Sequence, residues 1–159
     1  MKKIVLFLML GALAMSFSKK TATEIDNRLK FEYSIQVSEQ DKNTLIVTGK
    51  ITNKSNETIY YLSESCRGVK DYVIIGSKEI SKVNEMECFV NFMLYNSLKP
   101  NQNFTFKTML KRTNENAKIN LKFKFVELKK DLKLVEHNRI HNYKLADRKK
   151  VVYLDGEFK

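Results

Sequence analysis

The sequence predicts an all-β protein, an antiparallel sandwich of two packed sheets with seven or eight strands. Apolar residues recur at every second position in several short runs, which is the spacing at which side chains share one face of a strand. Clusters of polar turn residues separate these runs at intervals typical of sandwiches. Gly and Pro number only 5 and 1, so no flexible linker divides the chain. We therefore expect a single β-sandwich domain over residues 29–159.

The N-terminal 18 residues have the three parts of a secretory signal peptide. Two lysines supply positive charge, an uncharged apolar run follows at 4–15, and small residues stand at 16–18. The apolar run is shorter than the roughly 20 residues needed to cross a bilayer, although an uncleaved membrane anchor is the alternative. We expect an exported protein from which residues 1–18 are removed, with no transmembrane segment afterwards. Residues 19–28 are polar and aperiodic, which predicts a disordered leader.

The first strands are predicted from strict alternation. Residues 31–37 alternate apolar and polar side chains, as a half-buried strand does. Residues 44–62 are typical of a β-hairpin, because an alternating run is followed by turn residues at 53–56 and by a second β-rich run at 58–62. Three apolar residues of the first run share one face: Leu45, Val47 and Ile51.

The middle of the chain has shorter and less regular patterns. Residues 72–75 are apolar on both faces, which predicts a buried strand, and residues 77–85 have room for no more than one helical turn. Residues 97–103 form a predicted turn before a strand that begins at Phe104. A further strand is expected at 87–94, with three apolar residues on one parity: Cys88, Val90 and Phe92.

The clearest strand pattern occupies residues 118–126. Ile119, Leu121, Phe123 and Phe125 share one face, and Lys118, Asn120, Lys122 and Lys124 share the other. This pattern predicts one buried and one lysine-covered face. Residues 127–150 fit a strand and a short helix equally well, so a short helix near the C-terminal end stays open. A last strand is expected at about 149–154.

Cys66 and Cys88 are the only cysteines of the chain. In an exported protein an even pair predicts a disulfide, here closing a loop of about 22 residues. A reactive or metal-binding thiol is the alternative. Neither cysteine has the CxxC spacing or the adjacent histidine that such chemistry uses.

The sequence contains no recognisable catalytic or cofactor motif. His137 and His141 are four residues apart, but a zinc site would need a third ligand, and Glu136 would point elsewhere on a helix. We therefore expect no metal site, no cofactor and no enzymatic activity. An enzyme or inhibitor remains an alternative, because carboxylates from distant positions in the chain can form a site that leaves no motif in the sequence.

The net charge of +11 lies mainly in the C-terminal third. Residues 107–159 carry 15 basic and 7 acidic side chains, whereas residues 19–106 carry 12 and 11. A basic surface on an exported protein favours acidic lipid or glycan, and no nucleic-acid recognition motif is present. A lysine-rich solvated face is the alternative. The predicted basic face has six residues: Lys118, Lys122, Lys124, Arg148, Lys149 and Lys150.

Three tyrosines are candidates for contact with a protein partner. Aromatic residues on the outer face of a strand are enriched at protein interfaces. The candidates are Tyr60, Tyr61 and Tyr95.

Parts of the chain resemble small immunoglobulin-like domains in exported bacterial proteins. The resemblance covers residues 29–128 and rests on two stretches, which are 49–55 followed by Ile59, and 98–100 followed by Phe104 and Phe106. It implies a sandwich of the immunoglobulin or fibronectin-III kind. The core Trp of antibody domains is absent.

The same resemblance implies a role in binding or assembly. We expect a periplasmic or secreted, non-catalytic module of the cell envelope that contacts another protein through a sheet edge or loops. Two alternatives are an electrostatic binder of acidic lipid or glycan and an envelope enzyme or inhibitor.

Overall fold

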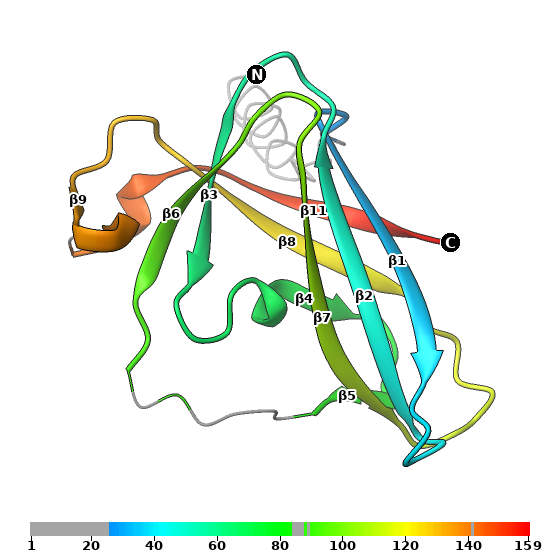
Figure 1. Ribbon diagram of the computed structural model, residues 1–159. Helices are drawn as coiled ribbons and strands as arrows, with labels where there is room; N and C mark the ends of the chain where they lie inside the picture. The colour runs from blue at the N-terminus through cyan, green and yellow to red at the C-terminus, as the bar shows by residue number, and fades with distance from the viewer. Residues whose placement is uncertain (1–25, 84–87, 89, 141) are drawn as a thin grey trace, which may run out of the picture.

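The computed structural model describes residues 26–83, 88, 90–140 and 142–159 (Figure 1). Within these residues all regular elements are strands or single 3-10 turns, so the predicted all-β class is confirmed. No helix in the described chain is long and apolar enough to cross a membrane. The predicted signal peptide lies outside the described residues.

The described part of the chain has eleven strands, more than the seven or eight predicted. Several extra strands are only two or three residues long, too short to leave an alternating pattern in the sequence. The strands are β1 (Leu29–Val37), β2 (Thr44–Asn53), β3 (Ile59–Glu64), β4 (Val73–Ile75), β5 (Ile80–Lys82), β6 (Met93–Leu98), β7 (Asn103–Arg112), β8 (Leu121–Leu128), β9 (Leu134–Val135), β10 (Arg139–Ile140) and β11 (Arg148–Phe158). The 3-10 turns are η1 (Lys70–Tyr72), η2 (Glu136–Asn138) and η3 (Leu145–Asp147).

The strands form one open sheet in the order β5-β7-β2-β1-β11-β8-β3-β6-β10-β9, with β4 also paired to β8. All pairs are antiparallel except β1 and β11, which run parallel over three residue pairs from Phe31 and Gly156 to Tyr33 and Phe158. The expected pair of separate sheets is therefore replaced by a single continuous one.

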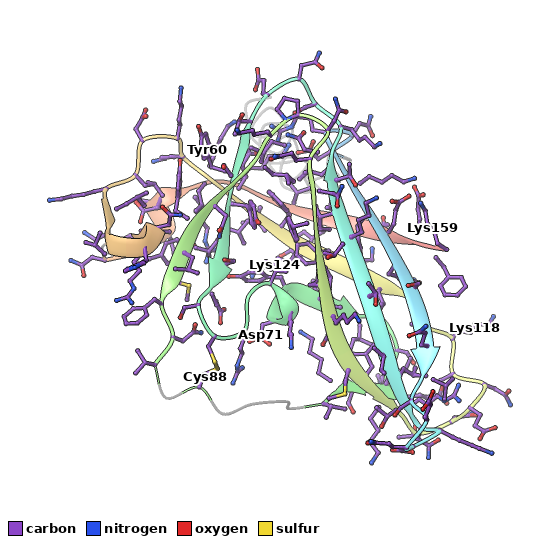
Figure 2. The ribbon with its side chains drawn as sticks, viewed as in Figure 1. Tyr60, Asp71, Cys88, Lys118, Lys124 and Lys159 are labelled. Carbon is purple, nitrogen blue, oxygen red and sulfur yellow. A yellow bond between two sulfur atoms is a disulfide. The ribbon has the colours of Figure 1, made fainter. Side chains whose placement is uncertain are left out.

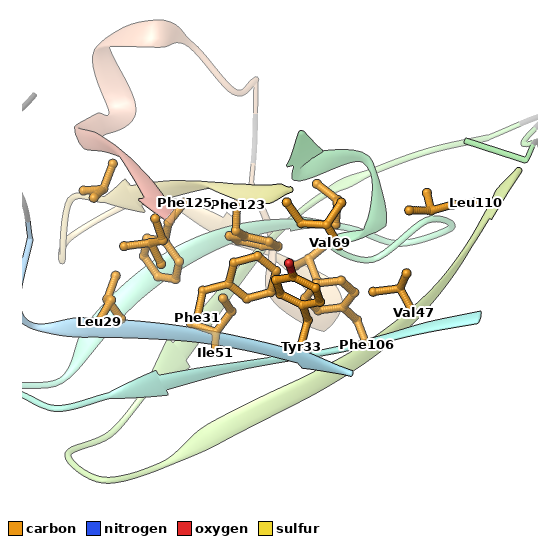
Figure 3. Packing of buried hydrophobic residues seen from close by; sticks show 14 of the residues in the cluster. Leu29, Phe31, Tyr33, Val47, Ile51, Val69, Phe106, Leu110, Phe123 and Phe125 are labelled. Carbon is orange, nitrogen blue, oxygen red and sulfur yellow. The ribbon is translucent and has the colours of Figure 1, made fainter. Parts of the chain in front are cut away.

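This sheet curls so that its two halves face each other. We call β5, β7, β2 and β1 the first half, and β11, β8, β3 and β6 the second half. The ring of Phe123 on β8 lies 5.4 Å from that of Phe106 on β7 and 5.6 Å from that of Phe31 on β1, measured between centroids (Figure 3). Since three strands separate β7 from β8 in the sheet, these contacts require the inner faces to pack together.

The core between the halves is apolar and rich in aromatic rings. The ring of Phe106 lies across Gly49, where any Cβ would be 2.3 Å from the ring, so a larger residue at position 49 would displace it. The largest buried side chains of this core are Phe31, Leu45, Val47, Ile51, Ile59, Leu110, Leu121, Phe123 and Phe125. The predicted inner faces of 31–37 and 118–126 contribute to it, except that Val37 at the end of β1 is 50% exposed.

Residues 44–62 are not a hairpin. Both strands exist, but β2 pairs with β1 and β7, and β3 pairs with β6 and β8. The buried Asn53 ends β2 of the first half, just before the turn that leads to β3 of the second half. Its amide donates to the carbonyls of Glu57 and Leu98 at 2.7 and 2.8 Å, and its side-chain oxygen accepts from the Ser55 N–H at 2.9 Å. The turn residues at 53–56 thus connect a strand of the first half to a strand of the second half.

Other predicted elements also differ. Residues 80–82 form β5 where one helical turn was expected, because they pair with the end of β7. The strand predicted at 87–94 begins only at Met93, and Val90 and Phe92 are 63% and 38% exposed. Residues 84–87 and 89 lie outside the described chain. Residues 26–28, assigned to a disordered leader, form a turn into β1 in which Asp26 is only 7% exposed.

The C-terminal region packs on the outer face of the second half. Among the described residues of 129–147 the only regular elements are short strands and 3-10 turns, and none of them is an α-helix. Val126 and Leu128 of β8 are buried beneath this region together with Leu62 of β3. This explains why β8 loses its alternation after Phe125. The last strand, β11, is longer than the predicted 149–154.

Replacing Phe123 by Ala should lower the free energy of unfolding by about 3–5 kcal/mol, because the variant loses apolar burial and leaves a cavity among four other rings. Urea denaturation followed by circular dichroism measures the change. The exposed Lys118→Ala variant is the control, expected within about 0.5 kcal/mol of the parent. A Phe123→Ala variant as stable as this control would contradict the described core.

Candidate functional site

The opening of the sheet lies between β6 and β7. These strands follow each other in the chain and are joined by the turn at 99–102, in which the Gln102 N–H donates to the Lys99 carbonyl at 3.0 Å and Asn101 has a φ of 60°. They nevertheless pair with different strands, β6 with β3 and β7 with β2. Figure 1 shows them diverging from their shared turn.

Backbone groups of β7 are exposed on the side of this opening. In an antiparallel pair, alternate residues direct their N–H and C=O groups to opposite edges of the strand. The Arg112 N–H donates to the Asn43 carbonyl at 2.9 Å, and the Asn53 N–H donates to the Gln102 carbonyl at 3.0 Å. The even-numbered residues of β7 therefore face β2, and its odd-numbered residues face the opening.

Only the C-terminal end of this β7 edge pairs with another described segment. The Val83 N–H donates to the Met109 carbonyl at 3.0 Å, and β5 continues the pairing from Leu110 to Arg112. No strand in the described chain pairs with residues 103–108 on this side. Asn103, Thr105 and Lys107 thus each present a backbone donor and acceptor at the open edge.

A shallow hollow of about 410 Å³ lies beside this edge, between β7 and the loop at 65–70. Its apolar lining includes Tyr61 and Phe104, whose rings stack with centroids 4.8 Å apart. Burial raises the pKa of the Tyr61 phenol above its ordinary value of 10.0. Arg67 and Lys107 are charged members of the lining. The hollow therefore combines an apolar floor with cationic side chains.

The predicted disulfide between Cys66 and Cys88 is confirmed, with Cα atoms 6.2 Å apart. It anchors the loop that lines the hollow (Figure 2). Glu64 and Gly68 exchange two backbone hydrogen bonds of 2.8 and 2.9 Å at the start of this loop, and Gly68 has a φ of 61°, which glycine adopts without strain. The loop is thus held by covalent and backbone contacts.

The three candidate tyrosines do not form one exposed patch. Tyr61 faces the core side, where it also packs on Phe125. Tyr60 and Tyr95 stack on the opposite face with centroids 5.1 Å apart. The Tyr95 hydroxyl donates to the carbonyls of Lys129 and Lys130, and burial raises its pKa to about 12. All three are half-buried, and the C-terminal region of this chain covers part of Tyr60 and Tyr95.

The six predicted basic residues are also divided. Lys118 and Lys124 lie apart (Figure 2), and Lys122 forms an ion pair of 2.8 Å with Asp155. The Arg148 side chain donates to the Tyr143 hydroxyl at 2.6 Å. Lys149 and Lys150 direct their ammonium groups to two buried carboxylates. Four of the six side chains therefore have a polar partner within this chain.

Those two carboxylates belong to an ion cluster of Asp26, Arg28, Glu127, Lys149 and Lys150. Arg28 Nη2 lies 2.8 Å from Asp26 and 2.6 Å from Glu127, Lys149 Nζ lies 2.8 Å from Glu127, and Lys150 Nζ lies 3.1 Å from Asp26. Glu127 is only 2% exposed. The cluster joins the residues before β1 to β8 and β11.

The cluster shifts both carboxyl groups toward the charged form. Hydrogen bonds from Arg28 hold the pKa of Asp26 well below its ordinary value, against the effect of burial. Burial alone would raise the pKa of Glu127, but hydrogen bonds from Arg28 and Lys149 outweigh it and lower that pKa. Sequence reasoning missed this cluster, although Glu127 has the same parity as Phe123 and Phe125. A carboxylate on an apolar face is the signal that indicates a buried ion pair.

The histidine pair lies in the irregular C-terminal region. His137 is exposed and has a φ of 56°, and His141 lies outside the described residues. No group of three or more His, Cys, Asp or Glu side chains in the described chain is arranged to hold a metal ion.

Acid should destabilise the protein through the ion cluster. Because the folded pKa values of Asp26 and Glu127 lie below their ordinary values of 3.8 and 4.5, the unfolded chain binds more protons as pH falls. The stabilisation is therefore complete above about pH 5 and is lost as pH drops toward 2. Urea denaturation at several pH values should show that an Asp26→Asn/Glu127→Gln variant is less stable than the parent at pH 7, with the difference shrinking in acid. The exposed Glu115→Gln is the control, and parallel pH profiles for parent and double variant would contradict the prediction.

Removing the disulfide should cost about 3 kcal/mol of stability, as estimated from the entropy of a loop of 22 residues. The Cys66→Ser/Cys88→Ser variant is compared with the oxidised parent by urea denaturation. Reduction of the parent should reproduce the loss, while the reductant should leave the variant unchanged. An equally stable variant would show that the bridge does not restrain the unfolded chain.

No family model matches this sequence, and no curated protein compared with it is significantly similar.

Proposed function

We propose that this protein is an exported, non-catalytic binding or assembly module of the bacterial cell envelope that receives an extended segment of another protein at the open edge of β7. One observation carries the proposal: Asn103, Thr105 and Lys107 direct backbone donors and acceptors into the opening, where no described strand pairs with them. An incoming strand pairs with such groups in β-strand addition.

Exposed sheet edges are normally blocked by charge, proline or a covering segment, because they invite pairing with other chains. The side chain of Lys107 offers partial protection of this kind, whereas Asn103 and Thr105 are uncharged. The adjacent hollow supplies apolar contact area in addition to backbone hydrogen bonds. An edge with a neighbouring hollow is suited to specific binding, since pockets for alternate side chains select the partner.

The fold family, the single domain and the cellular location belong to the same proposal. Two facing halves around one aromatic core support a single domain of the immunoglobulin or fibronectin-III kind. The disulfide supports an oxidising compartment, and the composition of residues 1–18 supports export to the periplasm or beyond.

Electrostatic binding of acidic lipid or glycan is the weaker candidate. Lys122, Lys149 and Lys150 form ion pairs with carboxylates of this chain, which offsets part of the charge on the predicted basic face. This alternative predicts binding that weakens steeply with salt.

An affinity capture from envelope extract tests the proposal, with the parent protein and the Thr105→Pro variant as separate baits. Proline removes the N–H that faces the opening without removing a bond to β2, so the strand should persist while the edge loses a donor. We expect the parent to retain a defined protein at both 0.05 M and 0.5 M salt, and Thr105→Pro to retain at least tenfold less. At 0.5 M salt the Debye length is below about 5 Å, so long-range attraction is screened.

Thr105→Ala is the matched control, because it removes the same side chain but keeps the N–H. Equal capture by Thr105→Pro and Thr105→Ala would exclude the β7 edge as the binding site. Capture of lipid or glycan at low salt alone would favour the electrostatic alternative.

A further inference from the structure

We infer that the segment received at the β7 edge is the C-terminal end of a partner chain, with apolar side chains second and fourth from its end. This partner rests on the proposed function and adds the direction, length and side-chain pattern of the bound strand. It follows from where the β7 edge is closed and from which side of β7 faces the hollow.

The open edge of β7 is closed at both ends. At one end the turn at 99–102 joins β7 to β6, and the Gln102 N–H donates to the Lys99 carbonyl at 3.0 Å. The first and last residues of such a turn are less than about 7 Å apart, so β6 leaves no room there for an added strand, which would lie about 4.8 Å from β7. At the other end the Val83 N–H donates to the Met109 carbonyl at 3.0 Å. An added strand therefore has room only beside residues 103–108.

The direction of the added strand follows from β5. This strand pairs with the same edge of β7 and runs antiparallel to it over Ile80–Lys82. Antiparallel pairing is also slightly more stable per residue than parallel pairing. A partner strand in the same direction runs from Lys107 toward the turn at 99–102, where the space ends. Its C-terminus therefore lies at the closed end, next to Asn103.

The backbone groups at the edge match five partner residues that end in a carboxylate. In an antiparallel pair, every second residue exchanges two hydrogen bonds with the residue opposite. A partner residue opposite Thr105 binds both backbone groups of Thr105, and the residue two positions earlier binds those of Lys107. The residue two positions later lies opposite Asn103, whose N–H donates to the terminal carboxylate. Capture of a C-terminal carboxylate by backbone N–H groups is a recurring mode of peptide recognition.

The two partner residues in between set the side-chain pattern. They lie opposite Phe104 and Phe106, and side chains of paired residues project to the same side of a sheet. On that side lies the hollow of about 410 Å³, whose lining includes Tyr61 and Val69. Apolar side chains at these positions, second and fourth from the C-terminus, are therefore removed from water. The first, third and fifth side chains project with the exposed odd-numbered side chains of β7.

The side-chain pattern is tested with random eight-residue peptides displayed on phage with a free C-terminus, with the full chain as target. We expect enriched peptides to have apolar residues second and fourth from the end. Synthesised as free peptides, they should bind at least tenfold more weakly when both of these residues are replaced by Ser, measured by fluorescence anisotropy. Replacement of the first and third residues from the end by Ser is the matched control and should change Kd less than threefold.

The requirement for a chain end is tested by extending the same peptides. Gly-Gly added after the last residue should weaken binding at least tenfold, because the added residues meet the turn at 99–102. Gly-Gly added before the first residue is the control and should leave Kd unchanged, since the partner chain leaves the edge at that end. Equal binding of the two extended peptides would show that the partner strand does not end at the turn.

The outcomes separate this inference from the proposed function. Enriched peptides that require the Thr105 N–H, judged by Thr105→Pro against Thr105→Ala, but tolerate the C-terminal extension or lack the apolar pattern would overturn the inference alone. Peptides that bind Thr105→Pro as well as the parent, or no enrichment at all, would overturn the proposed function. Lys107→Pro, which removes the next outward N–H, replaces Thr105→Pro if the latter unfolds.

Discussion

The contact of Phe123, on the second half of the sheet, with three rings of the first half is the constraint on which the rest of the structure depends. It requires the inner faces of β7 and β8 to lie against each other although three strands separate them in hydrogen-bonding order. Packed sheet faces are about 10 Å apart, whereas paired strands are about 4.8 Å apart. β6 and β7 are consecutive in the chain but lie in opposite halves, and each pairs with another strand of its own half. The open edge is a consequence of how the core is made.

The two sides of the curled sheet are held by different means. On one side, β1 and β11 join the halves by backbone pairing, and the ion cluster around Glu127 adds side-chain contacts between them. On the other side, the disulfide and the loop at 65–70 lie next to the opening between β6 and β7. The region that carries the proposed function is thus the one where strand pairing is incomplete. The disulfide joins the loop after β3 to Cys88 beside this region.

The success of the sequence-based predictions depended on whether each feature is local. Alternation correctly identified the core-facing residues of 31–35 and 118–126, because the period of two is a property of the strand itself, whereas Val37 is exposed. The pairing of 44–62 was wrong, because Asn53 bonds to Leu98, which is distant in the chain, and so directs β3 away from β2. Tyr60 and Tyr61 were treated as one patch, although adjacent strand residues face opposite sides. The basic face was predicted from the charge distribution along the sequence, which does not reveal the ion pairs of Lys149 and Lys150 with Glu127 and Asp26.

By itself the sequence determined the all-β class, the inner face of β8 and the partner of Cys66, since each follows from short-range periodicity or from there being only one other cysteine. Only the tertiary structure decided which strands pair, where the sheet stays open and which lysines form ion pairs. These depend on contacts between residues far apart in the chain, which no local pattern encodes. The candidate site is one of the features that the tertiary structure decided, because an edge is open only where no described strand pairs with it.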